Sequence, residues 1–152
     1  YPAIAPIIKK WWKLRYTLIP YIIAQSRKAI SSGAPLLQAL IFHHPEDKLC
    51  WHIDDEYYFG NDFLVAPVMN SENRRDVYLP EGQWVNFFTG EVLEGGRWLK
   101  DLDVPLDEMP VYVRQGATIP VYPDEVECTD EMDLSKSVEL HIDNHFKGIF
   151  KD

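Results

Sequence analysis

The first thirty residues place apolar side chains at the spacing of a helix. They recur at intervals of three or four, as Ile7, Trp11, Leu14, Leu18 and Ile22. The pattern predicts a helix over residues 4–30. Pro20 has no backbone N–H to donate, so we expect a kink there, and Gly33 after two serines predicts the end of the helix.

A short and nearly continuous apolar run, PLLQALIF, follows at residues 35–42. Such a run is typical of a strand that is buried on both faces, as in a parallel sheet flanked by helices. One helix followed by one such strand is only a fragment of an α/β pattern. The sequence therefore excludes a complete α/β domain.

From Asp62 onward, short segments rich in β-branched and aromatic residues alternate with turn residues. The segments are residues 63–69, 76–79, 84–88, 110–114 and 117–121, with glycines in the turns between them. Short strands separated by such turns predict an antiparallel sandwich or barrel. Residues 138–142 alternate as a further strand, with residues 146–150 as its candidate partner.

The charges are unevenly placed along the 152 residues, whose formal net charge is −9. Six basic residues precede Glu46, the first acidic residue, and the other nine Lys and Arg share the rest of the chain with all 24 acidic residues. This split indicates two unlike parts in one chain. An acidic chain is also poorly suited to nucleic acid, which binds through Lys and Arg, so we expect no nucleic-acid partner.

The composition also bears on whether the chain folds, meets a membrane or lies in a reducing compartment. Hydrophobic residues make up 46% of the chain, enough for a packed core. No apolar run approaches the roughly 20 residues that cross a bilayer, and no secretory leader is apparent, so no membrane partner is expected. Cys50 and Cys128 are the only cysteines and make no disulfide framework, which favours a reducing compartment and a cytoplasmic location.

Several motifs in a fixed order carry more specific information. They read LRYTLIPYI at residues 14–22, GAPLLQAL at 33–40, PED at 45–47, IDDEYYFGNDFLVAPV at 53–68, YLPEGQW at 78–84, FTGE at 88–91, GGRW at 95–98 and PVYVRQGATIP at 110–120. In this order they resemble glycoside hydrolase family 31, whose patterns include LRYxLxPYxY, GxPxxRPL, FPxD, DDQYxFGDxLLVAPV and PVFVRAGSIIP. The resemblance runs from about Lys13 to Pro120.

The resemblance implies a fold and an activity. The family consists of retaining α-glycosidases, chiefly α-glucosidases and α-xylosidases, with a (β/α)₈ barrel followed by a β-sandwich. It implies that residues 1–60 are the last helix and strand of the barrel, and residues 61–152 the proximal C-terminal sandwich, so that the fold is mixed but mainly β. The parent would hydrolyse terminal α-xylosyl or α-glucosyl residues of an oligosaccharide without a cofactor, and GGRW favours the α-xylosidase branch.

No catalytic residue is assigned to this chain. Retaining glycosidases need two carboxylates about 5–5.5 Å apart, and in this family both lie in earlier motifs that the chain lacks. Asp54-Asp55-Glu56 is the nearest substitute, but successive residues of an extended segment point to opposite faces. We therefore favour a structural role for the triplet, such as capping the following turn, and expect the chain alone to be inactive.

Gln38 is the candidate substrate-binding residue. It is the one polar residue inside the apolar run, and a buried amide needs a hydrogen-bond partner. Barrel active sites lie at the C-terminal ends of the strands, which allows a substrate-side role, but we favour an amide that braces neighbouring strands. The family has Arg-Pro where this chain has Gln38-Ala39, so no role of that arginine is transferred.

The remaining candidates have simpler interpretations. The histidines lack a third ligand at regular spacing, so no metal site is predicted; they are His43, His44, His52, His141 and His145. The strand aromatics could stack on sugar rings but are more often sandwich core; they are Trp84, Phe87, Phe88 and Trp98. The sugar-stacking alternative leaves a non-catalytic carbohydrate-binding β module as the second functional hypothesis.

The basic helix at the N-terminus allows two further interpretations. It could lie on an anionic membrane, but an outer barrel helix with a solvated Lys/Arg face gives the same pattern, and we favour the latter. With Trp11 and Trp12 on its surface, the helix predicts that the isolated chain associates with itself.

Overall fold

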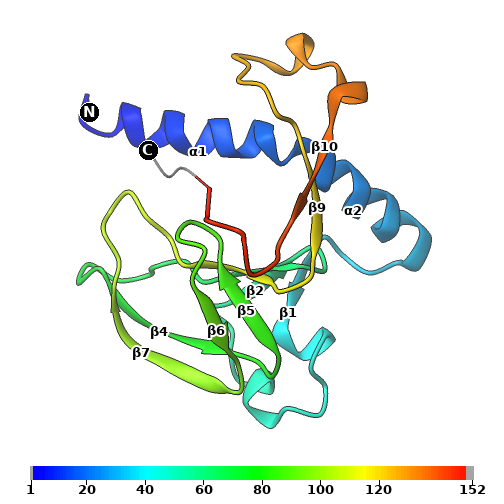
Figure 1. Ribbon diagram of the computed structural model, residues 1–152. Helices are drawn as coiled ribbons and strands as arrows, with labels where there is room; N and C mark the ends of the chain where they lie inside the picture. Colours follow the sequence, from blue (N-terminus) through cyan, green and yellow to red (C-terminus); the bar gives the residue numbers. More distant parts are fainter. Residues whose placement is uncertain (1, 150–152) are drawn as a thin grey trace. The chain divides into compact units, whose positions relative to one another are not determined.

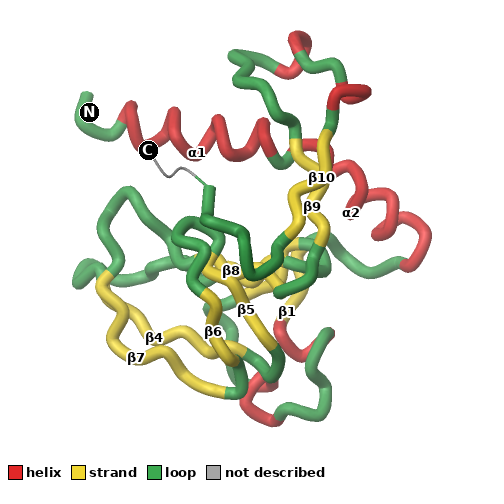
Figure 2. The backbone as a smooth tube through the Cα atoms, viewed as in Figure 1, coloured by secondary structure: helices red, strands yellow, loops and turns green. Residues whose placement is uncertain are grey.

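Residues 2–149 are described by a computed structural model (Figure 1), and the chain divides into two compact units. The first unit joins the helical part up to Gly33 with Thr118–His141. The second joins Ala34–Ala117 with the residues from Ile142 onward. Antiparallel strands and loops make up most of the second unit, and helices most of the first (Figure 2).

The first unit contains the predicted helix, broken into two. α1 spans Ala5–Thr17 and α2 spans Ile19–Ser32, with Leu18 between them. Pro20 stands in the first turn of α2, where its missing N–H costs no helical hydrogen bond. Gly33 ends α2 in the left-handed conformation, at φ 74°, and its N–H donates to the Ala29 carbonyl at 2.8 Å. The kink and the stop that the sequence predicts are confirmed.

Two strands and two short 3-10 turns complete the first unit. β9 (Thr118–Val121) pairs antiparallel with β10 (Val138–His141), and the 3-10 turns η3 (Thr129–Glu131) and η4 (Leu134–Lys136) lie between them. The Tyr122 N–H donates to the Thr17 carbonyl at 2.8 Å, which joins the end of β9 to the end of α1. Within residues 2–149, no helix has both the length and the apolar character needed to span a bilayer.

Basic residues of α1 face acidic residues that follow β9. Lys13 Nζ lies 2.5 Å from a Glu125 carboxylate oxygen, and Lys9 Nζ lies 3.6 Å from one of Glu127. These pairs are exposed and each contributes little to stability. They nevertheless show that the two charge classes, separated in the sequence, meet within one unit.

The second unit is built on a six-stranded antiparallel sheet. Its order is β1-β2-β3-β8-β5-β6. The strands span Leu37–Ala39 (β1), Tyr57–Phe59 (β2), Phe63–Val65 (β3), Val111–Arg114 (β8), Gln83–Asn86 (β5) and Val92–Glu94 (β6). A separate ribbon pairs β4 (Arg74–Leu79) with β7 (Arg97–Asp103), with a bulge between Arg75 and Val77.

A hydrophobic core joins the ribbon to one face of the sheet. The ribbon contributes Val77 and Leu79, and the sheet contributes Tyr58, Leu64 and Trp84, all at most 1% exposed. Together they form one cluster, to which Tyr112 and Cys50 also belong. This is the two-layer antiparallel β arrangement that the sequence predicts.

Residues 143–149 belong to the second unit and contact Phe87, the residue after β5. The Ile149 N–H donates to the Phe87 carbonyl at 2.9 Å, and the Phe146 ring stacks on that of Phe87 with centroids 6.0 Å apart. The expected pairing of residues 146–150 with residues 138–142 is therefore wrong for 146–149, and residue 150 lies outside the described part. Contacts with Phe87, and not strand pairing with β10, fix this segment.

The predicted doubly buried strand at residues 35–42 is also wrong. β1 has only three residues, it pairs antiparallel with β2, and it is followed by a 3-10 turn, η1 (Leu40–Phe42). Leu37 is 57% exposed and Phe42 62%. An apolar run does not reveal whether its strand is central or, like β1, the last in its sheet. The barrel part of the predicted fold is thus not confirmed by this chain.

The division at residue 60 stays a prediction. β1 and β2 precede that residue and β3 follows it, yet the three strands are hydrogen-bonded neighbours in one sheet. A domain boundary at residue 60 would separate β1 and β2 from β3, their neighbour in the sheet. A boundary that leaves this sheet whole would have to precede β1.

Candidate functional site

A cleft of about 680 Å³ opens in the second unit, and we call it the histidine cleft. It is lined by His43, His44, Pro45, Glu46, Asp47, Tyr78, Glu81, Gly95 and Gly96. The first five residues form the turn that follows η1, and the others come from the end of β4 and the turns near it. The cleft therefore lies where the η1 turn meets the ribbon.

Tyr58 of β2 holds both histidines in place. The His43 ring stacks on the Tyr58 ring with centroids 4.0 Å apart, and His44 Nε2 lies 2.7 Å from the Tyr58 hydroxyl. Arg114 donates to the same hydroxyl at 3.2 Å. The guanidinium only donates, so the phenolic proton is free to bond His44 Nε2 in the tautomer whose hydrogen lies on Nδ1.

The electrostatic setting keeps these histidines uncharged. Burial, reinforced by the Arg114 guanidinium, lowers the pKa of His43 to about 4 and lowers that of His44 in the same direction. At neutral pH both imidazoles are therefore neutral. The cleft presents neutral rings beside carboxylates.

Asp47 fixes the opposite side of the turn. Its Oδ2 accepts from the Tyr78 hydroxyl at 2.6 Å, and its Oδ1 accepts from the Leu49 N–H at 3.0 Å, at the start of the 3-10 turn η2 (Lys48–Trp51). Burial opposes ionisation of Asp47, but these hydrogen bonds prevail and lower its pKa. The carboxylate is therefore charged and held in one orientation.

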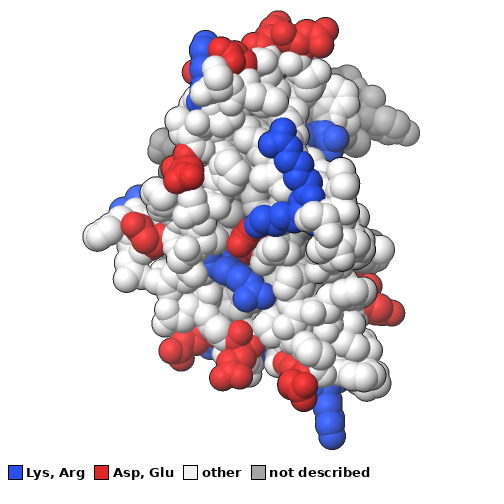
Figure 3. All heavy atoms as spheres, turned by 90° about the vertical axis from the view of Figure 1, so that its right-hand side faces the viewer, with Lys and Arg blue, Asp and Glu red and all other residues white. Residues whose placement is uncertain are grey.

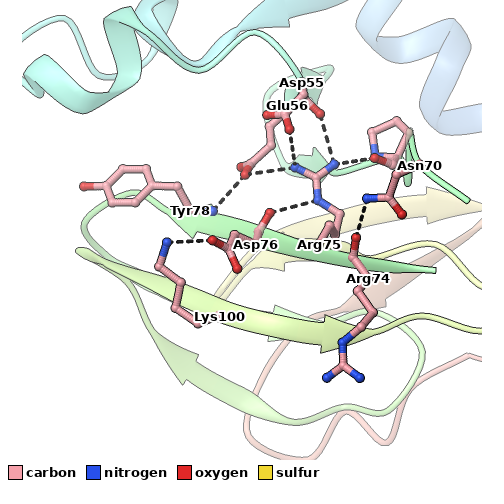
Figure 4. A network of polar contacts seen from close by, with 9 residues as sticks. Asp55, Glu56, Asn70, Arg74, Arg75, Asp76, Tyr78 and Lys100 are labelled. Atoms are coloured by element: carbon pink, nitrogen blue, oxygen red, sulfur yellow. Dashed lines mark hydrogen bonds and ion pairs between the residues drawn. The ribbon is translucent and has the colours of Figure 1, made fainter. Parts of the chain in front are cut away.

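A buried ion pair between Glu56 and Arg75 lies beneath the ribbon (Figure 4). Arg75 reaches in from β4, and Glu56 comes from the residue before β2. The Arg75 Nη2 lies 3.4 Å from Glu56 Oε1 and 3.2 Å from Asp55 Oδ2. The Glu56 side chain is fully buried, and that of Arg75 is 6% exposed.

Backbone groups complete this arrangement. Arg75 donates to the carbonyls of Pro67, Asp55 and Asp76, while Glu56 Oε1 accepts the Tyr78 N–H at 2.8 Å. Glu56 Oε2 is buried without a hydrogen-bond partner. Burial is the main cause that raises the pKa of Glu56 to about 7, against the opposing effects of the Tyr78 N–H and Arg75.

The acidic triplet does not form a pair of carboxylates facing one point. Glu56 is buried, whereas Asp54 and Asp55 are exposed. Two members of the triplet, Asp55 and Glu56, hold Arg75 of the ribbon. This is a structural role, as we favour for the triplet, but it differs in form from the capping of a turn.

Gln38, the predicted substrate-binding residue, is 8% exposed in β1. Its Nε2 donates to the Pro35 carbonyl at 2.7 Å. The amide therefore braces its own segment. A substrate-side role for Gln38 stays a prediction.

The other histidines are not among the residues that line this cleft. His52 and His145 are exposed, and His141 lies 3.2 Å from the Thr118 hydroxyl within the first unit. Across residues 2–149, no three His, Cys, Asp or Glu side chains gather as metal ligands would.

The strand aromatics mostly belong to the core. Trp84 is 1% exposed and Phe87 is fully buried, and the Trp84 indole donates to the Pro80 carbonyl at 2.9 Å. Trp98 is 36% exposed, but Tyr78 packs against its ring, and the Lys100 ammonium lies 4.5 Å from its centroid. The core interpretation is thus confirmed for Trp84 and Phe87.

Sequence reasoning missed Arg75, Tyr58 and Arg114. A signal for Arg75 was present, because it precedes Val77 and Leu79 at a spacing of two and so shares their buried face. Tyr58 and Arg114 had no such signal. Their importance comes from contacts between residues 14 and 56 positions apart in the chain.

Charged side chains are dispersed over the face drawn in Figure 3. Acidic side chains lie near both ends of this view, and the few basic ones do not merge into a broad patch. A phosphate backbone would need such a patch. The absence of a nucleic-acid partner stays a prediction.

Comparison with known proteins identifies a consistent set of relatives. Residues 33–119 match the family model of the glycosyl hydrolase family 31 C-terminal domain. An alpha-glucosidase 2 from Bacillus thermoamyloliquefaciens is 34% identical over 145 residues, which are 95% of this chain and 18% of that protein. An alpha-xylosidase from Saccharolobus solfataricus is 37% identical over 127 residues, 82% of this chain and 17% of that protein.

A solved structure shows the same relationship. A Flavobacterium johnsoniae GH31 dextranase, complexed with isomaltotriose, matches with a TM-score of 0.78 and 35% identity. The match covers 83% of this chain and 16% of the dextranase. The chain therefore spans less than a fifth of the length of these relatives.

Replacing Arg75 with Met should cost roughly 3 kcal/mol of unfolding free energy, because it leaves the Glu56 carboxylate buried without its counterion. The matched control is Arg74→Met. Arg74 is the preceding residue of β4 and forms an exposed pair with Asp101 at 2.6 Å, which contributes little to stability. Urea unfolding followed by circular dichroism measures both losses. Equal losses in the two variants would contradict the importance of the buried pair.

The raised pKa of Glu56 predicts the sign of a pH dependence. Its carboxyl titrates near 4.5 in the unfolded chain and about 7 in the folded one, so the folded state binds the proton more tightly. The contribution of Glu56 to the unfolding free energy is therefore complete below the unfolded-state pKa of 4.5. It is lost as the pH rises through the folded-state pKa of about 7, by roughly 3 kcal/mol in all. Glu56→Gln should remove this loss.

Unfolding free energies of both proteins at about pH 5 and about pH 7.5 measure the effect. His43, with a lowered pKa, contributes the opposite slope, but it does so in both proteins and cancels in the comparison. If the variant and the parent chain show the same change between the two pH values, Glu56 is not the group responsible.

Proposed function

This chain belongs to glycoside hydrolase family 31, and on that premise we propose that it is the C-terminal part of a retaining α-glycosidase. The relatives that carry this proposal are glycosidases, among them an alpha-glucosidase and an alpha-xylosidase. The substrate would be an oligosaccharide with a terminal α-glucosyl or α-xylosyl residue. One observation carries the assignment: the family model covers residues 33–119.

In this proposal the chain supports catalysis and does not perform it. A retaining glycosidase needs a nucleophile and an acid/base about 5–5.5 Å apart. Among residues 2–149, the buried carboxylate Glu56 pairs with Arg75, Asp55 pairs with the same guanidinium, and Asp54 is exposed. The catalytic pair would then come from the part of the relatives that this chain does not cover.

The location we propose is the cytoplasm. Cys50 is buried and Cys128 exposed, and the two form no disulfide. Burial raises the pKa of the Cys50 thiol to about 12, so that it is protonated and unreactive. Two free thiols are what a reducing compartment maintains.

Hydrolysis assays test the proposed function. The gene product that contains this sequence should hydrolyse p-nitrophenyl α-glucoside or α-xyloside, and proton NMR should show the α anomer of the sugar first, as retention requires. The 152-residue chain should release no sugar. As a control, Asp54→Asn in the longer protein should leave turnover unchanged. Turnover by the isolated chain, or a β anomer formed first, would refute the proposal.

We also propose that the isolated chain associates with itself through α1. Trp12 is 64% exposed, Ile8 on the same helix is 46% exposed, and Ile4 at the N-cap is 41% exposed, whereas Trp11 is partly buried. Trp12→Glu should convert the associated chain to a monomer, because it places a charge within the apolar contact. The matched control is Trp51→Glu, which changes a Trp of similar exposure (61%) in the second unit.

Sedimentation velocity over a range of concentrations measures this association. A chain that remains monomeric at the highest concentration would exclude it. Loss of association in the Trp51 variant instead would place the contact on the second unit.

A further inference from the structure

We propose that the histidine cleft binds one ring of a neutral sugar. The choice of a sugar rests on the proposed function, whereas the existence of a binding site rests on the cleft itself. Its volume of about 680 Å³ lies within the range of ligand clefts, roughly 300–1,000 Å³.

The walls of the cleft are held in place before any ligand arrives. His44 is fixed by the Tyr58 hydroxyl at 2.7 Å, and Asp47 is fixed by the Tyr78 hydroxyl at 2.6 Å. Both anchoring tyrosines are almost fully buried, at 0% and 4% exposure. A ligand would therefore meet oriented polar groups, which reduces the entropy lost on binding.

These fixed groups keep unused hydrogen-bonding capacity. The two carboxylate oxygens of Asp47 offer about four acceptor positions, and the Leu49 N–H, the Tyr78 hydroxyl and the Cys50 thiol use three of them. His44 uses Nε2 toward Tyr58, so its Nδ1 is available as a donor. Glu46 and Glu81, both exposed, add carboxylate acceptors at the rim.

The mixture of groups selects the kind of ligand. The cleft lining contains no Lys or Arg and includes three carboxylates, which disfavours phosphate, sulfate and carboxylate ligands. Sugar hydroxyls both donate to carboxylates and accept from an imidazole N–H, so a polyol satisfies both kinds of group. Pro45, which is exposed, offers apolar surface to the C–H face of a ring.

Gly95 and Gly96 leave one wall as bare backbone. A Cβ at Gly95 would lie 1.9 Å from the Pro80 carbonyl oxygen, so no side chain can occupy this position. Gly96 adopts φ 71°, which also favours glycine. A Cβ at Gly96 would meet nothing within 4 Å, so a sugar ring can approach the peptide groups of this turn.

Titration of the 152-residue chain with isomaltotriose, followed by two-dimensional ¹H–¹⁵N NMR, tests the site. We expect saturable shifts at His44, Asp47, Gly95 and Gly96, with a dissociation constant of roughly millimolar size, as a few hydrogen bonds in an open cleft provide. The double variant Glu46→Gln/Glu81→Gln should weaken binding about tenfold. The matched control Glu139→Gln changes an exposed carboxylate of β10 and should leave it unchanged.

Three results would overturn the inference. The first is the absence of chemical-shift changes at tens of millimolar sugar, and the second is changes confined to residues outside the cleft. The third is changes in the cleft that putrescine produces and the sugar does not, because this would identify a cation site. The dispersed spectrum of each variant shows that it is folded. Glycosidase activity of the longer protein is measured separately. If that protein is active but the cleft does not bind sugar, only this inference is refuted. If the cleft binds sugar but the longer protein is inactive, only the proposed function is refuted.

Discussion

The second unit depends on a carboxylate that is removed from water. Glu56 lies beneath the ribbon with its side chain fully buried, and such a charge is tolerated only when donors surround it. Arg75 and the Tyr78 N–H supply those donors from two positions of the same strand, β4. A shift of the ribbon by one residue would expose Val77, so apolar packing already opposes it. A shift by two residues would keep an apolar face toward the sheet but would separate Arg75 from Glu56, so the polar contacts oppose that one.

This buried pair is costly, which suggests that it provides specificity more than stability. Burial keeps the pKa of Glu56 near 7 in spite of its arginine, and Oε2 has no partner. A hydrophobic pair of the same volume would fill the space without that cost. It would not, however, direct β4 to a unique position, because Val77 and Leu79 offer only non-directional contacts.

Local periodicity explains which parts of this fold the sequence could predict. The break near Pro20, the cap at Gly33 and the alternating strands are encoded within a few residues, and the structure contains them. The strand at residues 35–42 was mispredicted because exposure of Leu37 depends on the position of β1 in its sheet, which no local pattern records. Arg75 and Glu56 are 19 residues apart, and Tyr58 and Arg114 are 56 apart, so their contacts become visible only once the chain has folded.

Tyr78 links the buried pair to the histidine cleft. Its backbone N–H donates to Glu56, while its hydroxyl donates to Asp47 at the wall of the cleft. Through Tyr78, the position of the ribbon therefore determines where the Asp47 carboxylate lies in the cleft. Tyr58 makes the corresponding connection from the sheet, since its ring belongs to the core and its hydroxyl holds His44. Because both walls are anchored to the same core, the geometry of the cleft follows from how the ribbon packs on the sheet.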